Sequence, residues 1–124
     1  MITCGIDVGS LTAEAVIFRD QDLWAYSLIP TGPNSAQTAT EALGEVLKKI
    51  NVRAEEIDFT VATGYGRVVV PFADRHMSEI SCHARGAHRF IPGVSTILDM
   101  GGQDCKAIRV DEKGNVTNFI MNDK

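Results

Sequence analysis

Residues 5–10 read Gly5-Ile-Asp-Val-Gly-Ser10, and this stretch indicates how the chain begins to fold. Ile6 and Val8 are apolar and alternate with small or polar residues, a period of two that is typical of a strand with one buried face. A tight Gly-Ser turn follows, and residues 13–18 resume the alternation. The stretch therefore predicts an antiparallel hairpin with Asp7 near the end of its first strand.

Outward from this hairpin, the chain alternates between strand and helix patterns. Apolar residues at helical spacing predict two helices, the first with Asn34 or Ser35 as its N-cap. The helices are expected at 36–50 and 77–89, and the strands at 3–8, 13–18, 23–29, 57–62, 95–100, 104–110 and 116–120. We therefore expect an α/β fold whose mixed sheet begins with three antiparallel strands flanked by both helices, followed by a restart of the strand pattern at residue 95.

The restart repeats the chemistry of the first hairpin. Asp99 stands before Gly101-Gly102 as Asp7 stands before Gly9-Ser10. Glycine at such a turn can be purely structural, and either carboxylate can simply cap its turn. Two turns of this kind, however, can offer backbone N–H groups to phosphates, while a carboxylate holds hydrated Mg²⁺.

These hairpins supply the candidate site residues. Asp7 and Asp99 are expected to hold Mg²⁺ through water, because Mg²⁺ usually keeps several of its waters. The contacts to phosphate are expected from the backbone N–H groups of Gly9, Ser10, Gly101 and Gly102. Gln103 is expected to orient an attacking water or to bind an oxygen of the γ-phosphate.

Composition narrows the class of protein. The chain has 124 residues, of which 44% are hydrophobic and 23% charged, as in a globular domain. Its net charge of −4 argues against nucleic acid as a partner, and its apolar runs are too short to span a membrane, so we expect a cytoplasmic protein. Cys4, Cys82 and Cys105 form no CxxC pair, which argues against a disulfide framework or zinc site.

Paired strand–turn–strand motifs of this kind resemble those of the superfamily that contains actin, heat-shock chaperones and sugar kinases. Within it, the chain resembles the activator ATPases of 2-hydroxyacyl-CoA dehydratases and the ATPase subunits of benzoyl-CoA reductases. The stretches that carry this resemblance start at Gly5, Thr63, Glu79, Asp99 and Asn118, and they read Gly-Ile-Asp-Val-Gly-Ser, Thr-Gly-Tyr-Gly-Arg, Glu-Ile-Ser-Cys-His-Ala-Arg-Gly-Ala, Asp-Met-Gly-Gly-Gln-Asp and Asn-Phe-Ile-Met-Asn-Asp-Lys.

The resemblance implies a ribonuclease-H-like (actin-like ATPase) lobe over residues 1–94 and the start of a second lobe over residues 95–124. It implies ATP or ADP and Mg²⁺ as ligands, and a four-iron, four-sulfur cluster shared across a homodimer. It further implies electron transfer from a ferredoxin or flavodoxin to the dehydratase or reductase, in anaerobic metabolism. None of the three cysteines matches the family's cluster ligand, and the adenine-binding glycines of the family lie beyond Lys124. We therefore expect residues 1–124 alone to be inactive.

Several other residues keep two interpretations. The resemblance suggests that Glu79 lies near the hydrolytic water, whereas spacing alone suggests a surface pair with His83 at i+4. Gly66 and Arg67 belong either to a loop that changes with nucleotide state or to a structural turn. Cys82 is interpreted as a buried thiol or as a residue facing a partner, and Lys106 as a solvated strand residue. We thus count Asp7, Asp99, Gln103 and Glu79 as candidate catalytic residues.

Two other functions remain open. A small-molecule kinase of the same fold would use a carboxylate as general base toward a substrate hydroxyl. The chain shows no sugar-binding motif, which weighs against the kinase. The second alternative is an inactive nucleotide-binding fragment.

Overall fold

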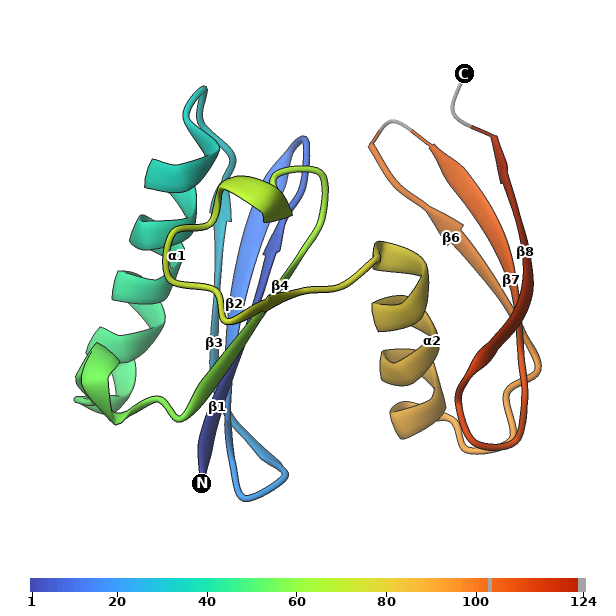
Figure 1. The fold of residues 1–124 in the computed structure, drawn as a ribbon, viewed down its shortest axis with the longest axis horizontal. Coiled ribbons are helices and arrows are strands. Elements are labelled where there is room, and N and C mark those ends of the chain that lie inside the picture. Colours follow the sequence, from blue (N-terminus) through green and yellow to red (C-terminus); the bar gives the residue numbers. More distant parts are fainter. Residues whose placement is uncertain (103, 123–124) are drawn as a thin grey trace. The chain divides into compact units, whose positions relative to one another are not determined.

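A computed structural model describes residues 1–102 and 104–122 of the chain. It divides into two compact units, residues 1–77 and 78–124, which we describe separately. Figure 1 shows both units and their elements. No helix in the described part of the chain combines the length and apolar character needed to cross a membrane.

The first unit is a five-stranded mixed sheet covered on one face by a helix. Its strands lie in the order β3-β2-β1-β4-β5. The elements are β1 (Ile2–Val8), β2 (Thr12–Arg19), β3 (Asp22–Pro30), α1 (Ser35–Ile50), the 3-10 turn η1 (Ala54–Glu56), β4 (Phe59–Thr63), the 3-10 turn η2 (Arg67–Val69) and β5 (Arg75–His76). Strands β1 to β3 pair antiparallel and β4 pairs parallel to β1, which confirms the predicted start of the sheet.

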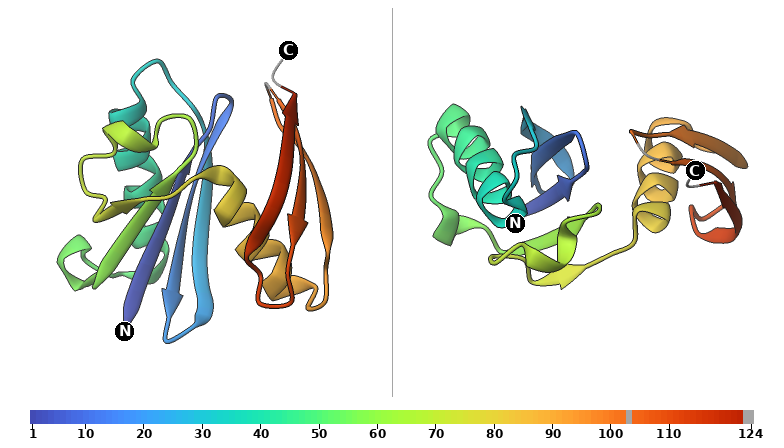
Figure 2. Two further views of the ribbon diagram at one scale, coloured as in Figure 1. Left: turned by 45° about the vertical axis from the view of Figure 1, so that its right-hand side comes forward. Right: turned by 90° about the horizontal axis from the view of Figure 1, so that it is seen from above.

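The core of the first unit follows from strand alternation. Ile6 and Val8 of β1 and Ile17 of β2 are fully buried on one face of the sheet, where α1 contributes Val46. Helix α1 lies along β1, β2 and β3 in both views of Figure 2. The opposite face of β1 carries Asp7, so the apolar core and the candidate site lie on different faces of the same strand.

The ends of α1 are fixed by local hydrogen bonds. Of the two predicted candidates, Asn34 is the N-cap, and its side chain accepts a hydrogen bond of 3.1 Å from the N–H of Gln37. At the other end Asn51 adopts the left-handed conformation with φ 54° and donates its N–H to the carbonyl of Leu47. Helix α1 therefore spans the predicted residues closely.

The second unit is a three-stranded antiparallel sheet with one helix. Its elements are α2 (Glu79–Phe90), β6 (Thr96–Met100), β7 (Cys105–Val110) and β8 (Val116–Asn122), with the strands in the order β6-β7-β8. Ile80 and Ala84 of α2 pack with Ile108 and Val110 of β7. The apolar stripe of α2 is thus used to cover this sheet (Figure 2).

Helix α2 differs from its predicted place. We expected it to flank the first sheet, but its apolar residues pack on β6, β7 and β8. The observed division falls at Met77/Ser78, whereas the predicted one fell between residues 94 and 95. The stretch between the observed and the predicted boundary contains α2. How far each lobe extends in the complete protein stays a prediction.

Candidate functional site

The first hairpin forms as predicted, and one of its amides is already occupied. The N–H of Gly9 donates to the carbonyl of Thr12 over 2.9 Å and closes the turn between β1 and β2. The carbonyl of Gly9 accepts from the hydroxyl of Thr31 over 2.9 Å. Ser10 is exposed at the tip of the turn, and its amide has no hydrogen bond within the described part of the chain. We therefore keep the proposal of phosphate contact for the amide of Ser10.

A glycine loop packs against the carboxylate of Asp7. Gly64, just after β4, has φ +91°, a conformation that favours glycine. A Cβ on Gly64 would lie 2.4 Å from Oδ1 of Asp7 and 2.5 Å from the carbonyl oxygen of Val8. The N–H of Gly66 donates to this same carbonyl over 3.0 Å. The loop is therefore a close-packed support for Asp7.

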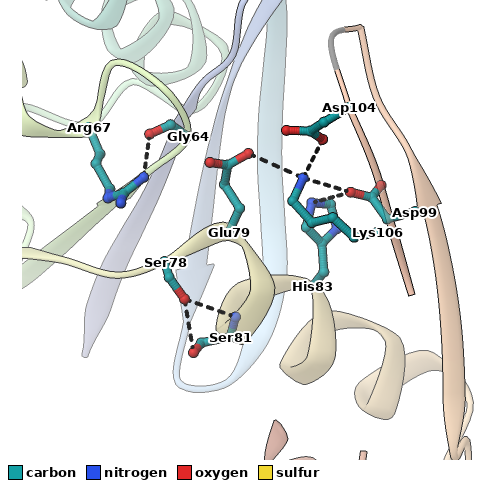
Figure 3. A network of polar contacts seen from close by, with 9 residues as sticks. All are labelled: Gly64, Arg67, Ser78, Glu79, Ser81, His83, Asp99, Asp104 and Lys106. Carbon is teal, nitrogen blue, oxygen red and sulfur yellow. Dashed lines mark hydrogen bonds and ion pairs between the residues drawn. The ribbon is translucent and has the colours of Figure 1, made fainter. Parts of the chain in front are cut away.

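Arg67 completes this loop. Its Nη1 donates to the carbonyl of Gly64 over 3.0 Å, which Figure 3 shows. A Cβ on Gly66 would lie 2.8 Å from Cγ1 of Val8. Of the two interpretations given to Gly66 and Arg67, this geometry favours the structural turn.

Strand pairing adds two residues that the sequence analysis did not single out. Asp7 stands opposite Glu14 on β2 and opposite Thr63 on β4, so the three side chains form a row on one face of the sheet. Oε2 of Glu14 and Oγ1 of Thr63 are buried, and neither has a hydrogen-bond partner among the described residues. Burial raises the pKa of Glu14, a hydrogen bond with Thr12 opposes this, and the charge of Asp7 adds to the rise. Only the strand register, which a single sequence specifies poorly, places these groups together.

The second hairpin repeats the backbone geometry of the first. The N–H of Gly101 donates to the carbonyl of Asp104 over 2.8 Å. The amide of Gly101 is therefore already hydrogen-bonded within the turn. The amide of Gly102 is exposed and has no hydrogen bond among the described residues, so we keep the proposal of phosphate contact for Gly102. Gln103 lies outside the described residues.

A buried lysine lies among the carboxylates beside the second hairpin. Lys106 has a side chain only 4% exposed, and its Nζ lies 2.6 Å from Oδ1 of Asp104, 3.4 Å from Oδ2 of Asp99 and 3.7 Å from Oε2 of Glu79. Figure 3 shows the ammonium group among these three carboxylates. The interpretation of Lys106 as a solvated strand residue is therefore wrong. Alternation along β7 contained the signal, because Lys106 shares its face with the buried Ile108 and Val110.

The carboxylates keep this lysine charged. Burial opposes the charge of Lys106. The hydrogen bond to Asp104, together with the charges of Asp104, Glu79 and Asp99, outweighs that effect, and the pKa of Lys106 is raised. The group is thus a permanent cation at physiological pH.

Helix α2 contributes two side chains to this cluster. Ser78 caps the helix by accepting the N–H of Ser81 over 3.2 Å, which places Glu79 in the first turn. Glu79 reaches Lys106, and Nε2 of His83 lies 3.5 Å from Oδ2 of Asp99. Both side chains reach from the helix to the sheet. Glu79 thus has a contact beyond its own helix, in the ion pair with Lys106, and its expected place near the hydrolytic water stays a prediction.

The donor atoms suit a hard cation held through water. Oxygen ligands are those that Mg²⁺ prefers, and each hairpin supplies a carboxylate at its strand end. Within residues 1–102 and 104–122, no group of three or more His, Cys, Asp or Glu side chains has the arrangement of a direct metal centre.

The three cysteines lie in different elements and differ in burial. Cys4 is buried in β1, and burial raises the pKa of its thiol to about 12. Cys105 is exposed at the start of β7, and Cys82 is half-buried on α2. Cys4 is therefore a residue of the apolar core of the first unit.

Comparison with known proteins identifies the family. The activator of lactoyl-CoA dehydratase from Anaerotignum propionicum is 46% identical over 125 residues, which cover 100% of this chain and 48% of that protein. The (R)-2-hydroxyglutaryl-CoA dehydratase activating ATPase of Acidaminococcus fermentans is 46% identical over 124 residues, with coverage of 98% and 47%. The chain thus spans about half the length of these curated relatives.

Solved structures give the same result. The activator of the 2-hydroxyisocaproyl-CoA dehydratase from Clostridium difficile, solved with bound ADPNP, superposes with a TM-score of 0.93 at 40% identity. The match covers 100% of this chain and 46% of that one. The fold is therefore that of the actin-like ATPases, which confirms the expected fold class. The model of the BadF/BadG/BcrA/BcrD ATPase family matches residues 4–124, and the chain belongs to this family.

Proposed function

We propose that the protein to which this chain belongs is an ATP-hydrolysing activator that donates single electrons to a 2-hydroxyacyl-CoA dehydratase or a benzoyl-CoA reductase. The observation that carries the proposal is the pair of hairpins, each with a strand-end carboxylate followed by an exposed turn. Relatives named as dehydratase activators, one of them with bound ADPNP, support it.

In this proposal the residues of the chain bind and orient the nucleotide phosphates. The amides of Ser10 and Gly102 donate to phosphate oxygens, and Asp7 and Asp99 hold the water shell of Mg²⁺. Bound Mg²⁺ supplies positive charge that offsets the charge developing on the transferred phosphoryl group. Glu79, directed to the second hairpin by α2, helps to orient the attacking water.

Electron transfer is assigned to the complete protein. The four-iron, four-sulfur cluster of the proposal is not assigned to the cysteines of this chain, since Cys4 is buried in the core of the first unit and none of the three stands at the ligand position that the family resemblance implies. A homodimer that receives electrons from a ferredoxin or flavodoxin is part of the same proposal.

The substitution Asp99→Asn in the full-length protein tests the proposal. Asparagine keeps an oxygen that can accept from Lys106, so we expect the fold to persist. It removes the negative charge, and we expect ATP turnover to fall by on the order of 10²-fold with a smaller change in nucleotide affinity. Steady-state ATP hydrolysis and titration with a fluorescent nucleotide analogue measure the two quantities.

Glu112→Gln is the matched control, because it removes a carboxylate from an exposed turn of the same unit. It should leave turnover unchanged. A wild-type protein without ATPase activity would contradict the proposal. If Asp99→Asn hydrolyses ATP at the wild-type rate, the role of Asp99 is wrong.

A further inference from the structure

The face of the first sheet that carries Asp7 also carries two buried polar atoms without a partner. They are Oε2 of Glu14 and Oγ1 of Thr63, and neither has a hydrogen bond among the described residues. Strand register places Glu14 on one side of Asp7 and Thr63 on the other. A buried polar group without a partner is unfavourable, and native proteins keep few of them. The proposed function does not yet use either atom.

The carboxylate of Asp7 lies toward β4 in this row. Its Oδ1 is so close to Gly64, the residue after Thr63, that a Cβ on Gly64 would lie 2.4 Å away. Glu14, on the side of β2, is a second carboxyl group, and the charge of Asp7 contributes to its raised pKa. The two carboxyl groups repel each other when both are ionised, and this repulsion favours the side of β4 for Asp7.

Thr63 has a hydrogen-bond donor on that side. Neighbouring strands lie about 4.8 Å apart, and Thr63 and Asp7 are direct partners on the same face, so a change of side-chain rotamer brings the hydroxyl to the carboxylate. A hydrogen bond from a hydroxyl to a carboxylate is stronger than one between neutral groups. It would give the buried hydroxyl of Thr63 a partner and fix the direction of the Asp7 carboxylate.

We propose that Thr63 is a positioning residue that donates a hydrogen bond to Asp7 and holds its carboxylate on the side of β4. The inference rests on the proposed function, in which Asp7 acts on the bound nucleotide, and it adds the group that orients Asp7. Thr63 acts through Asp7 and not on the nucleotide. The role requires the hydroxyl of Thr63, whereas a role in packing would require only its volume.

The test removes the hydroxyl without changing the shape of the side chain. In the full-length protein, Thr63→Val keeps the branched side chain and loses the donor, and Thr63→Ser keeps the donor. Thr40→Val is the matched control, because it removes a hydroxyl from an exposed position of α1 in the same unit. For each variant, kcat and KM for ATP are measured, together with the midpoint of urea unfolding without nucleotide.

We expect Thr63→Val to be at least as stable as wild type, because valine replaces a buried hydroxyl that has no partner. Its kcat should nevertheless fall about tenfold, the effect of losing one hydrogen bond to a charged group, with a smaller change in KM. Thr63→Ser should keep most of the turnover, and Thr40→Val all of it. In an Asp7→Asn background, Thr63→Val should change kcat by less than about twofold, because the carboxylate that Thr63 orients is gone.

A Thr63→Val protein that hydrolyses ATP at the wild-type rate would overturn the inference and leave the proposed function standing. A lower urea midpoint for Thr63→Val, or a loss of turnover that Thr63→Ser shares in full, would show a packing role and overturn the inference as well. The same follows if the loss persists undiminished in the Asp7→Asn background. A wild type without ATPase activity would instead overturn the proposed function, and with it the inference.

Discussion

Gly64→Ala is the substitution for which the structure gives the clearest expected cost. Gly64 lies where the loop after β4 passes closest to the first hairpin, with φ +91°. An added methyl group would lie 2.4 Å from Oδ1 of Asp7, 2.5 Å from the carbonyl oxygen of Val8 and 2.7 Å from its carbonyl carbon. The Asp7 carboxylate can rotate away, but the Val8 carbonyl belongs to the backbone of a central strand. The strand, the loop or both must therefore move.

Two contributions set the magnitude. An alanine held at this positive φ costs roughly 1–3 kcal/mol in backbone strain. Forcing extra volume against a packed backbone adds roughly 1–3 kcal/mol. We therefore expect the free energy of unfolding to fall by at least about 2 kcal/mol, a large fraction of the roughly 5–15 kcal/mol that stabilises a typical domain.

Gly44→Ala is the matched control in the same unit. Gly44 is exposed within α1, and an added Cβ there would meet nothing within 4 Å. Alanine is favoured over glycine inside a helix, so we expect this variant to gain about 1 kcal/mol. The two variants should thus differ by at least about 3 kcal/mol, which corresponds to a separation of about 1.5 M in urea midpoint for a slope near 2 kcal/mol/M.

Urea unfolding of the full-length variants, followed by circular dichroism, measures this difference. Titration with a fluorescent ATP analogue adds a second readout, because displacement of Asp7 should weaken nucleotide binding in Gly64→Ala and not in Gly44→Ala. A Gly64→Ala protein as stable as wild type would refute the packing argument. If Gly64→Ala is destabilised but binds the nucleotide as tightly as wild type, Asp7 does not contribute to nucleotide binding.

Three further expectations concern thiol reactivity, helix capping and the isolated chain. At pH 8, iodoacetamide should modify the exposed Cys105 readily and Cys4 hardly at all, since burial raises the pKa of Cys4 to about 12; mass spectrometry that finds both modified at the same rate would contradict this. Asn34→Ala should lower the free energy of unfolding by about 1 kcal/mol in urea titrations, because α1 loses the acceptor for the Gln37 N–H, and no change would show that the cap contributes nothing. Residues 1–124 alone should bind ATP weakly or not at all by calorimetry, because they span less than half of the relatives' length, and micromolar affinity would refute this.

Features with a local cause were predictable from the sequence. The alternation of Ile6 and Val8 predicted β1 with its buried face, and the turn residues after Val8 predicted the pairing with β2. Asn34 was one of two candidates for the cap of α1, and it is the residue that accepts the Gln37 N–H. Each of these depends on neighbours within a few positions, so one sequence is sufficient to find them.

Features that depend on tertiary pairing were not predictable in this way. The apolar stripe of α2 showed that the helix buries one face, but it did not show which of the two sheets this face packs against. The row of Glu14, Asp7 and Thr63 needs the register of β1 with two partners, one of which is distant in sequence. Lys106 is the intermediate case, because alternation placed it on the inner face of β7 while its charge suggested exposure.

The two carboxylates that look equivalent in the sequence, Asp7 and Asp99, have different charged neighbours. Asp99 lies 3.4 Å from the buried ammonium of Lys106, so its negative charge is stabilised within its own unit. Asp7 stands opposite Glu14, a second carboxyl group whose charge it disfavours, and beside the loop of Gly64 and Gly66, in which Arg67 donates to the carbonyl of Gly64. The side chains beside Asp7 therefore include a second carboxyl group, whereas those beside Asp99 include an ammonium. The two hairpins share the backbone hydrogen bond that closes the turn, and they differ in the charged side chains next to the strand-end carboxylate.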